Sequence, residues 1–210
     1  MAVTDFASLK TAVMDWADNT NITADRAGEF VQLATQLFNY GSQALSPLRV
    51  RQMEAIATLT PVDGVFTLPA DYLQYRRVIL ANSWRCTLEY ITPAKVDDLY
   101  PDRAGGVSQN FTIIGPSLLT YPTTSSDVEL TYYQKIPDLV DDADTNWLLT
   151  DSYGVYLHGA LLHLGMYTRD ADLISRSASL VTSLASGLVG TDELANYAYA
   201  QSMPRGITIA

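Results

Sequence analysis

Residues 132–165, YYQKIPDLVDDADTNWLLTDSYGVYLHGALLHLG, contain the change from one kind of secondary structure to another. The first residues continue an alternation of apolar and polar side chains that is typical of a β-strand. From Ser152 onward, apolar residues recur every three or four positions, which is typical of a helix. A proline, an acidic run and a tryptophan lie in between. The segment is therefore predicted to join a β-rich part of the fold to a helical part.

Two helices are predicted before the β-rich part, and together they should form a hairpin. The first should end near residues 18–21, and Thr23 is the predicted N-cap of the second. Pro47 is expected to stop the second helix because proline clashes with the preceding turn. The apolar face of the first helix consists of Phe6, Leu9, Val13 and Trp16, and that of the second of Phe30, Leu33, Leu37, Phe38, Ala44 and Leu45.

Residues 51–136 are predicted to form an antiparallel β-rich insert. Alternating apolar and polar residues, separated by turn sequences such as TPVDG, indicate six or seven strands. One strand is expected over residues 72–80 and another over residues 84–90. Pro93 can open a short helix, since proline is tolerated in the first turn.

The predicted fold class is α+β, a helical bundle made from the N- and C-terminal segments with an antiparallel β-rich insert. After the break at RDAD, helical spacing resumes at Leu173. The expected divisions are an N-terminal helical hairpin (1–50), the β insert (51–136), the C-terminal helices of the bundle (137–190) and a C-terminal tail (191–210).

The composition limits the classes of partner. A formal net charge of −10, from 23 acidic and 13 basic residues, argues against binding nucleic acid through its phosphates. The opening MAVTDFASLK does not have the pattern of a signal peptide, and no stretch reaches the ~18 apolar residues of a membrane span. Cys86 is alone, so neither an intramolecular disulfide nor a cysteine-based zinc site is expected. We expect Cys86 to pack in the core or in the hairpin around Trp84.

His158 and His163 are candidate metal ligands, but their spacing argues against that role. A separation of five residues places them about 140° apart around a helix. Paired zinc ligands on a helix use the spacing i, i+4. We expect imidazoles at the edge of the core, bonded to the backbone or to a tyrosine.

The acidic run resembles the start of a calcium-binding loop, with Asp142, Asp144 and Asn146 at alternate positions. The sixth place, Trp147, and the twelfth, Tyr153, do not carry the glycine and glutamate that such a loop needs. The run is better explained as a solvated linker near the N-terminus of the following helix. No metal and no cofactor is expected.

Enzymatic activity is not expected, and no catalytic residue is assigned. Motifs for an activated serine, a phosphate-binding loop or a dinucleotide site are absent from the sequence. A glycosidase needs two carboxylates at a fixed separation, which a sequence does not show. The candidate carboxylates are Asp71, Asp97, Asp98 and Glu129. The thirteen tyrosines could line a sugar-binding face, although at strand spacing they more often cover a half-buried sheet.

Four stretches, taken in order, resemble the head-to-tail connector adaptor proteins of tailed bacteriophages. They are LRVRQMEA (48–55), LPADYLQYRRVIL (68–80), FTIIGPSLLTYP (111–122) and the strand, linker and helix of residues 128–165. The resemblance covers residues 6–188. One departure is the sequence DSYG at 151–154, where the family pattern would enter the helix with proline and aspartate.

The resemblance implies a virion structural protein of the head-tail junction, made in the host cytoplasm. Such adaptors form a ring, expected here to be a dodecamer, that lies under the portal protein and offers its other face to a tail or nozzle protein. DNA would pass through the lumen without tight binding, and no membrane is involved. The tail Met203 to Ala210 would dock on the portal, with Arg205 supplying charge and Ile207 and Ile209 supplying apolar or added-strand contacts.

Two other functions stay open from the sequence. One is a carbohydrate-binding or glycosidase component of a phage tail, and the other is a different tail-completion subunit. Arg76 and Arg77 could form salt bridges between subunits or be ordinary exposed arginines. Trp84 and Trp147 could be interface anchors or fill the core.

Overall fold

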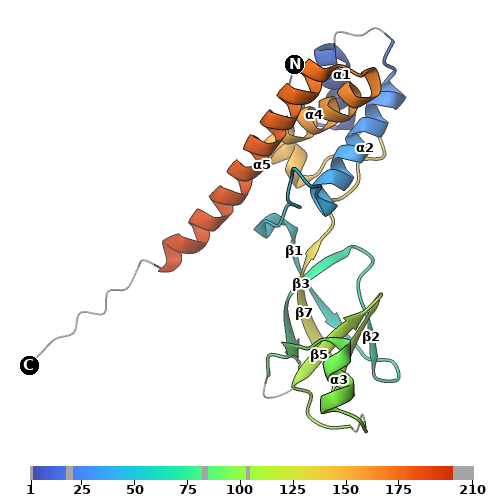
Figure 1. Cartoon of the computed structure of the whole chain (residues 1–210), viewed down its shortest axis with the longest axis vertical. Coiled ribbons are helices and arrows are strands. Elements are labelled where there is room, and N and C mark those ends of the chain that lie inside the picture. Colours follow the sequence, from blue (N-terminus) through green and yellow to red (C-terminus); the bar gives the residue numbers. More distant parts are fainter. Residues whose placement is uncertain (1, 18–20, 82–84, 103–104, 201–210) are drawn as a thin grey trace, which may run out of the picture. The chain divides into compact units, whose positions relative to one another are not determined.

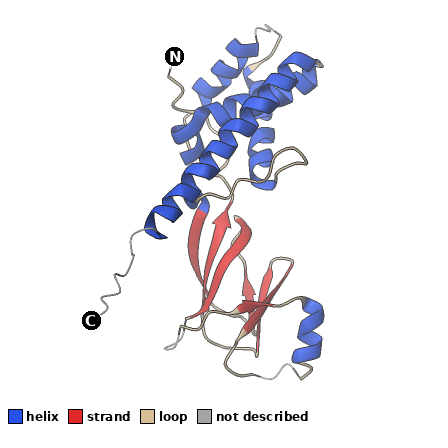
Figure 2. Ribbon diagram, turned by 60° about the vertical axis from the view of Figure 1, so that its left-hand side comes forward, coloured by secondary structure: helices blue, strands red, loops and turns tan. Residues whose placement is uncertain are grey.

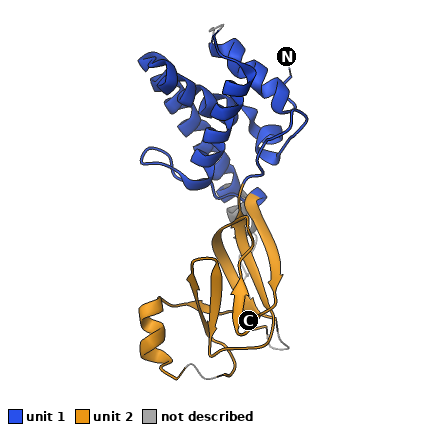
Figure 3. Cartoon of the chain, turned by 90° about the vertical axis from the view of Figure 1, so that its right-hand side faces the viewer, with its two compact units in different colours: residues 1–52, 136–210 blue, residues 53–135 orange. Residues whose placement is uncertain are grey.

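The chain forms two compact units, each described here by itself. The structure, a computed structural model, describes residues 2–17, 21–81, 85–102 and 105–200, with side chains up to Glu193. Unit 1 comprises Met1–Gln52 and Ile136–Ala210, and unit 2 comprises Met53–Lys135 (Figure 3). Helices make up the described regular structure of unit 1 and mainly strands that of unit 2, so the chain is α+β (Figure 2).

Unit 1 begins with α1 (Phe6–Ala17) and α2 (Ala24–Tyr40). The Thr23 hydroxyl accepts a hydrogen bond from the Arg26 N–H, which confirms the predicted N-cap. Trp16 has the spacing of a core residue yet is 61% exposed. The apolar face of α1 is buried at its other three positions: Phe6, Leu9 and Val13.

The end of α2 lies earlier than the sequence predicts. Gly41 has a φ of +74°, and a Cβ at this position would lie 2.7 Å from Pro47 Cδ. The chain turns here because glycine adopts this conformation without a steric penalty. Leu45 and Leu48 are buried all the same, in an irregular segment whose Leu48 N–H donates to the carbonyl of Phe38. The prediction that the helix continues to Pro47 is therefore wrong.

The second half of unit 1 consists of α4 (Trp147–Thr168) and α5 (Ala171–Ala200). α4 packs against α1, α2 and α5, and is the central helix of the unit (Figure 1). It begins five residues before the predicted start, and Ser152, at φ −153° and ψ 63°, interrupts its helical geometry. α5 continues without a break past Gly190, so no helix end lies where the sequence suggests that a tail starts.

Unit 2 contains a three-stranded and a four-stranded sheet. The first has the order β1 (Glu54–Leu59), β7 (Val128–Gln134), β3 (Tyr72–Leu80), with antiparallel pairing throughout. The second has the order β2, β6, β5, β4. The short helix α3 packs against β5. The bounds of these elements are Val65–Thr67 for β2, Ser117–Tyr121 for β6, Asn110–Ile114 for β5, Glu89–Tyr90 for β4 and Pro93–Leu99 for α3.

The expected strand over residues 84–90 is only partly formed. β4 covers two residues and pairs parallel with β5, so the insert is not entirely antiparallel. Between β3 and β4, Leu80 N–H donates to the carbonyl of Cys86 and Leu88 N–H to that of Val78. This segment therefore continues along the edge of one sheet and then joins the other. Residues 82–84, with Trp84, lie outside the described residues.

The core of unit 2 joins both sheets. Alternate side chains of β1, β3 and β7 point to one face, as a strand period of two requires. They pack with residues from β2, β5 and β6 in one buried cluster. The fully buried members are Phe66, Val78, Leu80, Phe111, Leu118, Val128 and Leu130.

Candidate functional site

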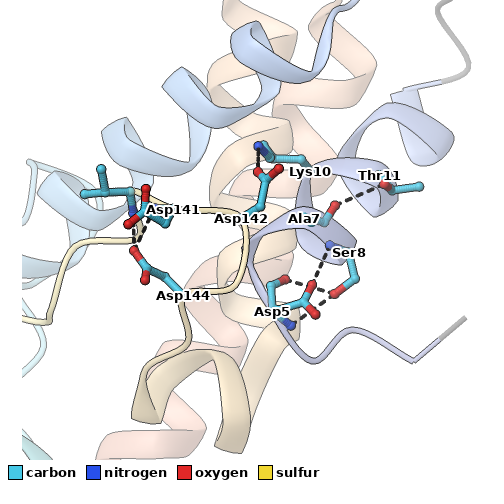
Figure 4. Close-up of polar contacts among 9 residues, drawn as sticks. Asp5, Ala7, Ser8, Lys10, Thr11, Asp141, Asp142 and Asp144 are labelled. Carbon is cyan, nitrogen blue, oxygen red and sulfur yellow. Dashed lines mark hydrogen bonds and ion pairs between the residues drawn. The ribbon is translucent and has the colours of Figure 1, made fainter.

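The acidic run before α4 holds the start of α1. The backbone carbonyls of Asp144 and Asp142 accept hydrogen bonds from the N–H groups of Phe6 and Ala7. These are N–H groups of the first helical turn, which have no partner within the helix. The Asp142 carboxylate also forms an ion pair with Lys10 (Figure 4). The linker therefore connects α1 to the segment that leads into α4, within unit 1.

The Asp144 carboxylate is also used locally. It accepts hydrogen bonds of 2.8 Å from the backbone N–H groups of Val140 and Asp141 (Figure 4). These bonds favour the charged form and lower the pKa of Asp144. Among the residues that the structure describes, no cluster of three or more potential metal-ligating side chains is found.

Asn146 is the most heavily bonded side chain of the linker. Its Oδ1 accepts from the Leu149 N–H as the N-cap of α4, and its Nδ2 donates to Pro137 O and to the Tyr156 hydroxyl. Tyr156 is fully buried, and its hydroxyl lies 3.5 Å from that of Thr35 on α2. Burial raises the pKa of Tyr156. The network fixes α4 against α2, whereas Trp147 is only half-buried.

The two histidines have different surroundings within unit 1. The His158 ring makes an edge contact with Trp16, with 5.6 Å between the ring centroids. His163 Nε2 is buried and lacks a hydrogen-bond partner among the described residues, contrary to the expected bond to backbone or tyrosine. Burial lowers the pKa of both imidazoles.

The candidate acids for glycoside hydrolysis lie in different segments of unit 2. Asp71 accepts a hydrogen bond of 3.0 Å from the Tyr132 hydroxyl. Burial, together with the hydrogen bond and the charge of Asp71, raises the pKa of Tyr132 to about 12. Glu129 accepts two bonds from Arg85. Asp97 and Asp98 lie on α3.

Arg76 is engaged within its own unit. It forms an ion pair with Glu54 and donates a hydrogen bond to the Tyr133 hydroxyl. Arg77 is exposed. Cys86 is half-buried with a free thiol. The tail Met203 to Ala210, with Arg205, lies outside the described residues.

Unit 1 carries large aromatic side chains on its surface, among them Trp16 and Tyr153, whose exposure the sequence pattern does not predict. Trp16, Tyr153 and His158 line a cavity of about 240 Å³ between α1 and α4. Across α4, a Cβ on Gly154 would lie 3.4 Å from Leu184 of α5. The surface therefore continues from α1 over α4 to α5.

α5 is apolar and poorly covered. Residues 171–193 are long and apolar enough to cross a membrane, by length and composition alone. Only 17% of the most apolar window is buried within the protein. Core helices of soluble proteins can share this length and composition, so these properties alone do not indicate a membrane.

A comparison with protein-family models adds the decisive observation. The model of the SU10 adaptor protein family matches residues 4–203, nearly the whole chain and both units. The chain belongs to the SU10 adaptor protein family. No curated protein sequence matches it.

Membership of the SU10 adaptor family confirms the resemblance found in the sequence. It identifies the chain as a bacteriophage structural adaptor, a component of the virion that interacts with other head or tail proteins. The SU10 adaptor family is a structural family and is not known for enzymatic activity. Surfaces that bind other proteins are therefore the functional features to seek.

Proposed function

We propose that this protein is the connector adaptor of the head-tail junction, forming a ring between the portal protein and the tail. The ring would contain twelve copies, with the helices of unit 1 as a bundle around the axis. It would be assembled from subunits made in the host cytoplasm. A tail or nozzle protein would bind its other face, and DNA would pass through the lumen.

The observation that carries the proposal is the family match over residues 4–203. The net charge of −10 supports it, since a conduit for DNA should not bind phosphates tightly. In unit 2, Asp71 and Glu129 bond to Tyr132 and Arg85, and these contacts do not support a glycosidase. A role as another tail-completion subunit is the outcome that the experiments below must separate from the connector.

The tail Met203 to Ala210 is proposed to bind the portal. Alternating residues of GITIA suit an added strand, and Arg205 supplies a positive charge. Deleting these eight residues should weaken binding to purified portal protein at least tenfold, measured by biolayer interferometry. The deletion lies beyond α5 and should leave the circular dichroism spectrum and the unfolding midpoint unchanged.

A matched pair of variants sharpens this test. Ile207→Ser with Ile209→Ser should reproduce the loss, whereas Thr208→Ser should bind as the unaltered chain does. Unchanged portal binding after the deletion would remove the role of the tail. Electron microscopy of the adaptor with portal tests the ring, because particles without an added ring would argue for another virion layer.

A further inference from the structure

Large and small residues of α5 are placed in an unusual way. Its side chains buried within unit 1 are of modest size: Ser177, Val181 and Ala185, each at most 3% exposed. Leu180 and Leu184, next to this row, are 44% and 37% exposed. A helix that served only its own unit would normally turn its leucines inward. These leucines are therefore available to a partner.

The exposed leucines belong to a long stripe. Leu173, Leu180, Leu184 and Leu188 follow one another at helical spacing, over about 22 Å of helix. We call this stripe the α5 face. Gly154 of α4 lies beside this face, since a Cβ at that position would lie 3.4 Å from Leu184. A long, narrow apolar stripe suits another helix packed alongside it better than it suits a small ligand.

A second stripe lies on α2. Leu33 and Tyr40 are 42% and 62% exposed, and Leu37 lies between them, half-buried. The three residues have the spacing i, i+4, i+7, which places them on one side of the helix. We call this stripe the α2 face. The opposite side of α2 carries buried residues, with Val31 and Phe38 among them.

The two faces cannot cover each other within one molecule. α2 and α5 each pack on α4, and they are not packing partners of one another. Figure 1 shows them on either side of α4. A partner that covers either face would therefore come from outside the molecule. A second copy of this chain could cover both faces, because each copy offers one face of each kind.

We propose that the α5 face of one copy docks on the α2 face of the next, in a head-to-tail interface. Because the two faces differ, the contact is heterologous, and its repetition produces a closed ring when the rotation closes. The inference rests on the proposed ring and names the surfaces that form it. The partner in this contact is a second copy of the chain.

Complementation of single-face variants tests the interface. Leu180→Asp places a charge on the α5 face, and Leu33→Asp places one on the α2 face. Both positions are exposed, so the fold should be retained, as circular dichroism and unfolding midpoints would check. The controls are the exposed neighbours on the same helices, Ser179→Asp and Gln32→Asp.

Sedimentation velocity should find oligomers for the unaltered chain and for both controls. Each face variant alone should sediment as a monomer. An equal mixture of the two variants should form dimers and nothing larger, because each brings one intact face. If the α2 variant assembles by itself like the unaltered chain, or if the mixture stays monomeric while the unaltered chain assembles, the interface is wrong.

Chemical cross-linking tests the same interface if the copies associate too weakly for sedimentation to detect. In a Cys86→Ser background, chains with Leu184→Cys and chains with Leu33→Cys are mixed and treated with a short bismaleimide. A linked dimer should form at least fivefold more than with Ser179→Cys and Gln32→Cys. No excess over these controls would overturn the inference, even if the free chain is monomeric.

Vesicles address the apolar character of α5. The unaltered chain is not expected to float with phosphatidylcholine and phosphatidylglycerol vesicles. Flotation that Leu180→Asp abolishes, without cross-linking between copies, would replace the inference with a lipid contact.

Failure of the proposed interface can be distinguished from failure of the proposed function, since imaging of virions shows whether the protein lies at the head-tail junction. Cross-linked copies of a protein that lies elsewhere in the virion would refute the proposed function alone.

Discussion

The two units are held together in different ways. Unit 2 is one continuous segment, closed by strand ladders and by a core shared between its sheets. Unit 1 joins two segments that lie far apart in the sequence, and several of their ties are single polar groups. For example, Asn39 Oδ1 accepts from the Ile136 N–H where the chain returns to unit 1. Stability should therefore be spread widely in unit 2 and concentrated at fewer positions in unit 1.

The largest effects are expected from matched core substitutions. Phe38 of unit 1 and Phe66 of unit 2 are both fully buried. Each change to Ala should lower the free energy of unfolding of its own unit by about 3–5 kcal/mol, since it removes apolar contact and leaves a cavity. Hydrogen exchange read by mass spectrometry should show faster exchange in the substituted unit alone. Equal acceleration in both units would show that the two units unfold together, which contradicts the comparison.

A polar substitution should reveal the dependence of unit 1 on single side chains. Asn146→Ala removes the N-cap of α4 and leaves Pro137 O and the Tyr156 hydroxyl without this donor. The expected loss is about 1–3 kcal/mol, because both a cap and buried hydrogen bonds disappear. Urea unfolding measures it, and the exposed neighbour Thr145→Ala is the control. A loss no greater than that of the control would mean that the helices of unit 1 do not need this network.

Local signals explain what the sequence predicted well. Thr23 caps α2 as expected, and β3 spans Tyr72–Leu80 as predicted, because a capping hydroxyl and strand alternation act over a few residues. The Ser152 interruption and the parallel pairing of β4 depend on contacts with distant segments. A sequence pattern shows no such contacts. For that reason the prediction was weakest at the ends and joints of elements.

The same limit applies to the candidate site. Spacing placed Trp16 with Phe6, Leu9 and Val13 on one face of α1, but only a packed structure shows that this face is incompletely covered. Periodicity identifies residues that share a side of a helix, whereas burial depends on what lies opposite. The family resemblance was found from the order of local segments. The docking faces on α2 and α5 required the arrangement of the helices around α4.

The smallest effects concern pH, and the two units should respond at opposite ends of the scale. In unit 1, burial holds the pKa values of His158 and His163 below the ordinary value of 6.5. The unfolded chain then takes up protons first as pH falls, so stability is lost below about pH 6.5. In unit 2, the pKa of Tyr132 is raised to about 12 from an ordinary value of 10. The unfolded chain loses that proton first, so stability is lost as pH rises from about 10 to 12.

Two substitutions separate these responses. His163→Gln should reduce the loss of stability of unit 1 between pH 7.5 and pH 5. The loss that remains should be due to His158. Tyr132→Phe removes the hydrogen bond to Asp71 and should cost about 0.5–1.5 kcal/mol at neutral pH. It should also reduce the loss between pH 9 and pH 11.5, whereas the exposed Tyr90→Phe should not. Unit-resolved exchange at each pH is the measurement. If Tyr132→Phe keeps the full alkaline loss, the buried hydroxyl is not its source, and Tyr72, whose pKa burial also raises, becomes the group to replace next.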